Sequence, residues 1–234
     1  MKTKAVFNWS SGKDSALALY HTLNNDQMEV CTLMTTVNAE LERISMHGLR
    51  RSMLEAQVAC LDLPLSVMSL PGEVTMEDYD RLMREQMEGF KSQGITHSLF
   101  GDIFLEDLKD YRDARLAEVG MKGHYPIWKR DTKELINEFL NLGFRTLIVA
   151  VDGSKLDRSF AGKEIDKDFI AALPDGVDPC GENGEFHTFV FDGPIFKKPV
   201  AFEKGEVVAR EYNLSKESNE KVTYWFQDLI PTRE

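Results

Sequence analysis

The stretch Ala5–Leu23, with the sequence AVFNWSSGKDSALALYHTL, constrains the fold of this chain more than any other. Its first five residues form a short apolar run, which is typical of a buried strand. From Asp14 onward, apolar residues recur at helical spacing. The Ser-Ser-Gly sequence between these two parts carries no bulky side chain, so we expect a strand, a tight turn and a helix in direct succession.

The turn in this stretch has the properties of an anion-binding site. The first N–H groups of a helix have no partner within the helix, and the helix dipole favours negative charge at this end. The residues that we expect at this site are Ser10, Ser11, Gly12, Lys13, Asp14 and Ser15. The plainer alternative is an ordinary turn in which Asp14 or Ser11 caps the helix. The glycine spacings of a Walker A loop and of a Rossmann turn are both absent.

Strand-like and helix-like segments alternate along the first two thirds of the chain. Strands are predicted at residues 5–9, 30–37, 65–70, 96–100 and 145–151. Helices are predicted at residues 14–23, 45–61, 75–92, 105–119 and 131–142, with Thr75 and Asp131 as N-caps. This alternation predicts an α/β fold with a doubly wound five-stranded parallel sheet. Such sheets bind ligands beyond the carboxyl ends of their strands, where the Ser-Ser-Gly turn and Gly101-Asp102 lie.

The last third of the chain has a different character. Glycine and proline become frequent after Asp152, and shorter strands are predicted at residues 186–191, 207–211 and 222–226. We therefore divide the chain into a first domain at residues 1–152 and a smaller C-terminal α+β region at residues 153–234. The second region is expected to cover one edge of the predicted site.

A second cluster of reactive residues occurs in the sequence CGENGEFHTFV, from Cys180 to Val190. Its polar candidates are Glu182, Asn183, Glu185 and His187. Such groups could orient ammonia, accept protons or hold a metal, and the two glycines allow close approach of a ligand. Because strand residues two apart share a face, we expect Glu185 and His187 to point together into the cleft, with Phe186 toward the core. The alternative is a solvated turn in which Glu185 and His187 pair in solvent.

Composition disfavours several classes of function. The formal net charge of −11 disfavours nonspecific binding of nucleic acid, and no run of lysine or arginine indicates a membrane surface. No segment has the apolar length of a membrane span, and the N-terminus lacks a signal-peptide pattern. The three cysteines are far apart and form no Cys-x-x-Cys pair, which favours a cytoplasmic location and disfavours a zinc or iron–sulfur centre.

Both motifs occur together in one protein family. The SSGKDS turn resembles the pyrophosphate loop of the PP-loop ATP pyrophosphatases, which are adenine nucleotide alpha-hydrolases, with Ser11 in place of a usual glycine. With GDI at 101–103, PIW at 126–128 and GENGEFHTFV at 181–190, the chain resembles the diphthine–ammonia ligase family of these ATP-binding proteins. The order and spacing of the motifs match the family over most of the chain.

The resemblance implies an ATP-dependent ligase that forms an amide. ATP would bind with its phosphates over residues 10–15, a substrate carboxylate would displace pyrophosphate, and ammonia would then displace AMP. Lys13 and a Mg²⁺ held by Asp14 would neutralise the charge that develops on the pyrophosphate. His47, Gly101 and Asp102 are further nucleotide-binding candidates, and the catalytic candidates are Lys13, Asp14, Glu182, Asn183, Glu185 and His187.

The acceptor of the predicted reaction stays open at this point. Where family members carry a Met-Tyr-His or similar pattern after the second strand, this chain has Met-His-Gly at 46–48. A Trp-Leu-Gly-Arg segment of the family is replaced by Phe-Ala-Gly-Lys at 160–163. Both segments should lie near the acceptor, which would be diphthine on a protein or the carboxylate of a small metabolite. A nucleotide sensor without turnover is the alternative from another class, and the sequence does not exclude a homo-oligomer.

Overall fold

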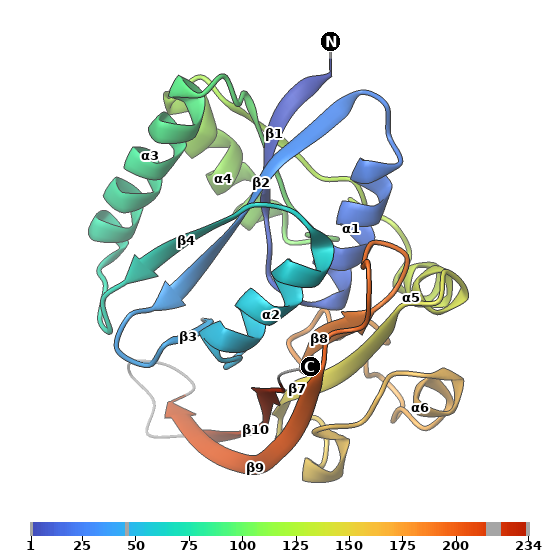
Figure 1. The fold of residues 1–234 in the computed structure, drawn as a ribbon. Helices are drawn as coiled ribbons and strands as arrows, with labels where there is room; N and C mark the ends of the chain where they lie inside the picture. Colours follow the sequence, from blue (N-terminus) through green and yellow to red (C-terminus); the bar gives the residue numbers. More distant parts are fainter. Residues whose placement is uncertain (1, 45–46, 214–220, 233–234) are drawn as a thin grey trace.

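The computed structural model describes residues 2–44, 47–213 and 221–232 (Figure 1). Its first sheet contains the parallel strands β1 (Thr3–Asn8), β2 (Met28–Asn38), β4 (Leu65–Leu70), β5 (His97–Leu99) and β6 (Lys122–His124). These strands lie in the order β4-β2-β1-β5-β6. The two-residue strand β3 (Arg43–Ile44) pairs antiparallel with β2. The strand order therefore reverses between β1 and β5.

Helices cover both faces of this sheet (Figure 1). One group comprises α1 (Lys13–Leu23), α2 (Arg51–Leu61) and α5 (Thr132–Asn141), and the other comprises α3 (Met76–Ser92) and α4 (Glu106–Glu118). The pleat of β1 divides its side chains between the two groups, because Ala5 and Phe7 pack with the first and Val6 packs with the second. The predicted doubly wound parallel sheet is thereby confirmed.

The second sheet is antiparallel and lies below the first in Figure 1. Its strands are β7 (Arg145–Asp152), β8 (Phe186–Asp192), β9 (Phe202–Asn213) and β10 (Lys221–Pro231), in the order β8-β7-β10-β9. The prediction that residues 145–151 form the fifth parallel strand is wrong, since they form β7 of this sheet. The fifth parallel strand is β6, whose sequence Lys-Gly-His contains no apolar run that would indicate a buried strand.

Several predicted ends of helices and strands are confirmed, and others differ from those in the structure. The N-caps Thr75 and Asp131 are confirmed, because each side chain accepts hydrogen bonds from backbone N–H groups of the following turn. The second helix begins only at Arg51, and residues 45–46 of its predicted start lie outside the described residues. The strands predicted at 207–211 and 222–226 are parts of the longer β9 and β10.

The C-terminal third adds two short helical segments to the antiparallel sheet, which gives it the predicted α+β character. They are a 3-10 helix (Arg158–Phe160) and α6 (Lys167–Ala171). The division of the chain at residue 152 stays a prediction, while the two sheets themselves divide between β6 and β7. None of the helices in the described residues is long and apolar enough to cross a membrane.

The two sheets share one core and contact each other directly. Phe7 of β1 and Phe189 of β8 belong to the same cluster of buried side chains, and both are fully buried. The backbone N–H of Val190 in β8 donates a hydrogen bond of 3.0 Å to the carbonyl of Ser11. The second sheet therefore holds its strand β8 against the Ser-Ser-Gly turn, which brings the two sequence motifs together.

Candidate active site

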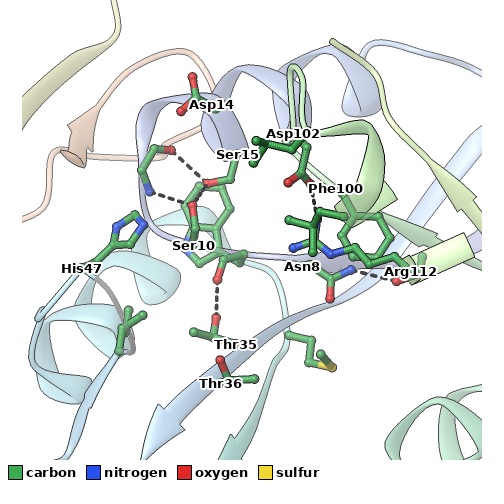
Figure 2. A pocket seen from close by; sticks show the side chains of 18 of the residues that line it. Asn8, Ser10, Asp14, Ser15, Thr35, Thr36, His47, Phe100, Asp102 and Arg112 are labelled. Carbon is green, nitrogen blue, oxygen red and sulfur yellow. Dashed lines mark hydrogen bonds and ion pairs between the residues drawn. The ribbon is translucent and has the colours of Figure 1, made fainter. Parts of the chain in front are cut away.

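A cavity of about 740 Å³ opens near the carboxyl ends of β1, β2 and β5. It lies where the strand order of the parallel sheet reverses, which is the usual ligand position in doubly wound folds. Figure 2 shows the side of the cavity that includes Asn8, Ser10, Thr35, Phe100 and Arg112. The second motif borders the same cavity with its residues 180–182, 184 and 186–188. Its volume is in the range of small-molecule binding sites.

The turn between β1 and α1 forms as predicted, but no side chain of the turn itself caps the helix. Gly12 is the N-cap residue, so neither Asp14 nor Ser11 has the capping role of the plainer alternative. Ser11 has a φ of 70°, in the left-handed region that favours glycine. Serine at this position costs roughly 1–2 kcal/mol of backbone strain. The Ser10 hydroxyl donates a hydrogen bond of 3.0 Å to the Ser15 hydroxyl across the turn (Figure 2).

Side chains of β8 and α2 hydrogen-bond to the backbone of this turn and support it. The hydroxyl of Thr188 accepts a hydrogen bond of 3.0 Å from the backbone N–H of Lys13. The amide of Gln57, which is fully buried, donates to the carbonyls of Ser11 and Val190 at 3.0 and 2.6 Å. The sequence predicted a supporting role for neither residue. Thr188 lies within the second motif and could have been found there, whereas Gln57 lies on an ordinary helix without any motif.

Lys13 and Asp14 form an ion pair at the start of α1. The Lys13 Nζ lies 2.7 Å from each Asp14 carboxylate oxygen. Burial by itself lowers the pKa of Lys13, but the carboxylates of Asp14 and Glu182 more than compensate and raise it above its ordinary value. The result is a permanent positive charge beside the unpaired N–H groups of the helix, with the Asp14 side chain still 30% exposed at the cavity.

Glu182 is the acidic residue of the second motif that borders the cavity. Burial, together with the nearby carboxylates of Asp14 and Asp178, raises the pKa of Glu182 to about 7, although Lys13 acts in the opposite direction. A carboxyl group with a pKa near neutrality can both accept and release a proton at physiological pH. Glu182 is therefore the acid–base candidate that the geometry favours.

Glu185 and Asn183 hold the loop together and do not border the cavity. The buried Glu185 carboxylate accepts hydrogen bonds from the N–H of Asp178, the N–H of Asn183 and the Asn183 side-chain amide, at 3.1, 2.9 and 3.0 Å. Burial opposes its ionisation, but these bonds lower the pKa of Glu185 below its ordinary value. The prediction that Glu185 and His187 point together into the cleft is wrong, because β8 begins only at Phe186 and strand alternation does not extend to Glu185.

His47 and His187 border the cavity as a stacked pair, with ring centroids 4.7 Å apart and an interplanar angle of 24°. Figure 2 shows His47 beside the turn that carries Ser10. A β-carbon added to Gly12 would lie 3.2 Å from His47 Cε1, so His47 packs closely on the turn. Burial lowers the pKa of His47 to about 3 and that of His187 to about 4, and the Lys13 charge adds to both effects. Both imidazoles are therefore neutral.

Gly101 and Asp102 follow β5 and border the cavity. A β-carbon on Gly101 would lie 2.8 Å from the Ser15 backbone, so glycine here permits close packing on α1. Asp102 accepts a hydrogen bond from Arg112, whose guanidinium lies 4.6 Å from the centroid of the Phe100 ring (Figure 2). The turn after β5 is thereby fixed against the start of α1, and Arg112 is one of the arginines that border the cavity.

Another part of the cavity is a groove lined by α3, α4 and the segment before α4. Its apolar side chains are Met76, Tyr79, Met83, Met87, Phe104, Leu105, Leu108 and Leu116, and its charged ones are Asp80, Arg84, Arg112, Arg115 and Glu118. The sequence analysis did not identify this groove, because apolar residues at helical spacing are typical of a buried helix face. Met76 and Leu105 are 67% and 57% exposed at its edge. Such a surface suits a nucleotide base or the apolar part of an acceptor.

Asp14 is the predicted ligand for Mg²⁺. Within the described parts of the chain, no group of three or more His, Cys, Asp or Glu side chains is arranged to hold a metal ion. In nucleotide sites, however, Mg²⁺ is commonly held by one or two carboxylates together with phosphate oxygens and water. The partly exposed carboxylate of Asp14 fits this limited role, so a Mg²⁺ here would arrive with the nucleotide.

A doubly wound sheet with a serine-rich anion turn at the reversal of its strand order is typical of nucleotide-binding proteins and is consistent with the PP-loop type. Comparison with protein families then identifies the particular family. The chain belongs to the diphthamide synthase family, whose N-terminal domain matches residues 1–123 and whose C-terminal domain matches residues 131–221. The gap between the two matches begins at the end of β6 and precedes α5 and β7.

Curated proteins of similar sequence bear the name diphthine–ammonia ligase. The protein from Schizosaccharomyces pombe is 26% identical over 218 residues, which cover 85% of this chain and 36% of that protein. Those from Bos taurus and Homo sapiens are each 31% identical over 142 residues, which cover 57% of this chain and 51% of each relative. In these matches the chain spans about half the length of the relatives or less.

Proposed function

We propose that the protein is an ATP-dependent ligase that adenylates a carboxylate and transfers the acyl group to ammonia, releasing pyrophosphate and AMP. The observation that carries this proposal is the meeting of the SSGKDS turn and the segment 182–188 in one cavity. A sensor of nucleotides needs the anion turn, but it has no use for an acid–base group such as Glu182 beside it. The names of the relatives from yeast and mammals support the same activity.

The start of α1 would bind the phosphates of ATP. Its N–H groups and the Lys13 ammonium favour the negative charge that grows on pyrophosphate as the bond to the α-phosphorus breaks. When bound with ATP, a Mg²⁺ held by Asp14 would supply further charge neutralisation. Arg112, which borders the same cavity and pairs with Asp102, adds further positive charge.

Glu182 would take the proton that nitrogen loses when the amide forms. Its raised pKa of about 7 makes the ionised form available near neutral pH while keeping proton uptake favourable. Glu185 and Asn183 would contribute indirectly, because their hydrogen bonds shape the loop that presents Glu182. In this proposal Glu182 touches the reacting atoms and Glu185 positions it.

The apolar side chains of the groove between α3 and α4 would contact either the adenine base or the apolar part of the acceptor. The acceptor itself is a carboxylate, either diphthine on a protein or a small metabolite. We further propose a reducing cytoplasm as the setting, because the three cysteines are few and dispersed. A homo-oligomer is compatible with this proposal.

A screen of acceptors tests the proposed function. The protein is incubated with ATP, Mg²⁺, ¹⁵N-ammonium and a series of carboxylates that includes diphthine on its carrier protein. We expect AMP and pyrophosphate to accumulate only with a suitable acceptor, and the acceptor to gain one ¹⁵N. Formation of ADP and phosphate, or tight ATP binding without any turnover across the series, would contradict the proposal and favour the sensor.

A further inference from the structure

We propose that the stacked imidazoles of His47 and His187 form the binding site for the nitrogen donor, and that they take it as neutral ammonia. This inference rests on the proposed function and assigns a place to its second substrate. The sequence analysis gave His47 to the nucleotide and paired His187 with Glu185. The structure instead separates Glu185 from the cavity and stacks the two rings on each other at its border.

His47 presents a hydrogen-bond acceptor that has no partner. Its Nδ1 is buried and makes no hydrogen bond to any of the described residues. Two other buried side-chain atoms in the described parts of the chain make no hydrogen bond, on Glu138 and Thr146. The Glu138 atom forms an ion pair of 2.7 Å with Arg130, and neither residue borders the cavity. A buried acceptor without a partner is costly unless a ligand satisfies it. A small donor that enters from the cavity would satisfy the His47 acceptor.

The His47 ring is held in place by its neighbours, because it stacks on His187 and packs on Gly12. A neutral imidazole carries its proton on one nitrogen and keeps a lone pair on the other. In the tautomer that this proposal uses, Nε2 carries the proton, and the buried Nδ1 keeps its lone pair for an incoming N–H donor. His187 stacks on this ring and brings a second neutral imidazole to the same place.

The local charge favours ammonia over ammonium. Lys13, from the start of α1, lowers the pKa of each ring through its positive charge. The carboxylates of Asp14, which pairs with Lys13, and of Glu182 border the same cavity and partly offset this charge. The same field opposes the entry of a second cation, whereas neutral ammonia can donate to the imidazole acceptors without that penalty. Ammonia is also the only form of this substrate with a lone pair on nitrogen.

The position of the pair places the nucleophile beside the phosphate turn. His47 packs against Gly12, and Thr188 hydrogen-bonds to the N–H of Lys13 in the same turn. From this place the ammonia lone pair attacks the carbonyl carbon of the acyl-adenylate and forms the C–N bond. The bond from that carbon to the oxygen of AMP breaks, and AMP leaves with the electron pair. One proton passes from nitrogen to Glu182, so atoms and charge balance.

Histidine NMR tests the ammonia site without the need for an acceptor. Protein labelled with ¹⁵N-histidine is titrated with ammonium chloride and, separately, with sodium chloride at about pH 7 and about pH 8.5. We expect the imidazole signals of His47 and His187 to shift with ammonium chloride alone. The total ammonium needed for half the shift should fall about tenfold for each pH unit, because the fraction of ammonia rises by that factor.

Two variants make the test specific. His47→Phe keeps a planar ring against His187 and removes the acceptor, so the ammonium needed to shift the His187 signal should rise at least tenfold. His21→Gln is the matched control, because His21 lies on the last turn of α1 beside Glu138 and does not border the cavity. In His21→Gln, the imidazole signals of His47 and His187 should shift as they do in the unaltered protein.

Equal shifts with both salts would overturn the ammonia site, as would a midpoint that does not depend on pH. These two readings use the unaltered protein, so they hold even if His47→Phe does not fold. Failure of the proposed function gives a different result, in which ammonia shifts the two histidines but no carboxylate yields AMP. That result would support the ammonia site and contradict the proposed ligase activity.

Discussion

At the scale of single residues, the chemistry of this molecule depends on three ionisable groups that meet at the start of α1. Lys13 is buried and held in its charged form by Asp14 and Glu182. Glu182 in turn has its pKa raised by burial and by the same Asp14 carboxylate. Each of these charges therefore sets the protonation of another, and a change at one residue should be measurable at its neighbours.

Asp14 should be needed for turnover of ATP. Asp14→Asn keeps the shape of the side chain while it removes both the charge that pairs with Lys13 and the candidate Mg²⁺ ligand. We expect kcat for AMP formation to fall more than tenfold, which corresponds to about 1.4 kcal/mol or more of lost transition-state stabilisation. Asp26→Asn, at an exposed position beyond the far end of α1, is the control and should leave kcat unchanged. A wild-type rate in Asp14→Asn would refute this role.

Glu182 should make the folded protein less stable as the pH rises. Its pKa is about 7 when folded, against an ordinary 4.5, so the folded state binds more protons than the unfolded state between these pH values. The free energy of unfolding of the wild type therefore falls as the pH rises between these values, whereas that of Glu182→Gln does not fall for this reason. We expect the free energy of unfolding of the variant, relative to wild type, to rise by about 1–3 kcal/mol from about pH 4.5 to about pH 7.5 in urea titrations.

Glu185→Gln is the matched control for this measurement, with the opposite sign. The pKa of Glu185 is lowered by its hydrogen bonds, so its ionised form stabilises the fold above the ordinary carboxyl pKa and loses this effect as the pH falls. Glu185→Gln should therefore be most destabilised near neutral pH. The same pH trend in both variants would show that the assigned environments are wrong.

At the scale of elements, strand β8 connects the two motifs of the sequence. It begins at Phe186, carries His187 and Thr188 to the border of the cavity, and pairs through Val190 with the turn before α1. The phosphate turn of the first sheet is thus shaped partly by a strand of the second sheet. Binding of nucleotide should consequently respond to changes in β8 that alter its hydrogen bonds to the turn.

Thr188→Val tests this connection. The substitution keeps the size and β-branching of the side chain and removes the acceptor for the Lys13 N–H. We expect the free energy of unfolding to fall by about 1–2 kcal/mol and KM for ATP to rise. Thr22→Val is the control, because the Thr22 hydroxyl is equally buried but bonds only to Ala18 of its own helix. Equal effects on KM for ATP in both variants would contradict the role of β8.

The sequence predicts which segments form helices and strands better than it predicts which elements pair with one another. The strand, turn and helix around Gly12 and the N-caps Thr75 and Asp131 depend on local backbone chemistry, which is why they could be predicted. The sheet to which β7 belongs could not, because an apolar strand buried on both faces fits either a parallel or an antiparallel sheet. The short β6 was missed because its sequence Lys-Gly-His carries no strand signal.

The candidate site shows the same limit. Lys13, Asp14, Glu182 and His187 could be named from their motifs, and all four border the cavity. The orientation of the Glu185 side chain could not be predicted. Side chains alternate between the two faces only within a strand, and β8 starts one residue after Glu185. The stacking of His47 on His187 is a contact between segments far apart in the chain, and neither local pattern encodes it.

At the scale of the whole molecule, Asp228 of β10 ties the second sheet to the first. Its carboxylate accepts hydrogen bonds from Arg43 of β3 and from Arg50, which precedes α2, and it is 12% exposed. Burial opposes ionisation, but these two guanidinium groups lower the pKa of Asp228 below its ordinary value. The ion pairs therefore stabilise the fold above the ordinary carboxyl pKa, and this contribution is lost as the pH falls.

Asp228→Asn should weaken the joint between the sheets. It leaves two arginines without their counter-charge, so we expect the free energy of unfolding at neutral pH to fall by about 2–3 kcal/mol. The difference from wild type should shrink in acid, where Asp228 is protonated. Asp62→Asn is the control, since Asp62 forms an exposed pair with Lys197 and should change stability by less than about 1 kcal/mol. Similar losses in both variants would contradict the account.

The central claim is that a carboxylate of the acceptor attacks the α-phosphorus of ATP. The most direct measurement uses the acceptor that gives most AMP, labelled with ¹⁸O in its carboxylate, and follows the label by mass spectrometry of the AMP. Attack at the α-phosphorus forms a bond to one carboxylate oxygen, and the later loss of AMP from the acyl carbon leaves that oxygen on phosphorus. We predict one ¹⁸O in each AMP formed in the presence of ammonia. AMP without label would contradict the acyl-adenylate and with it the reaction assigned to this site.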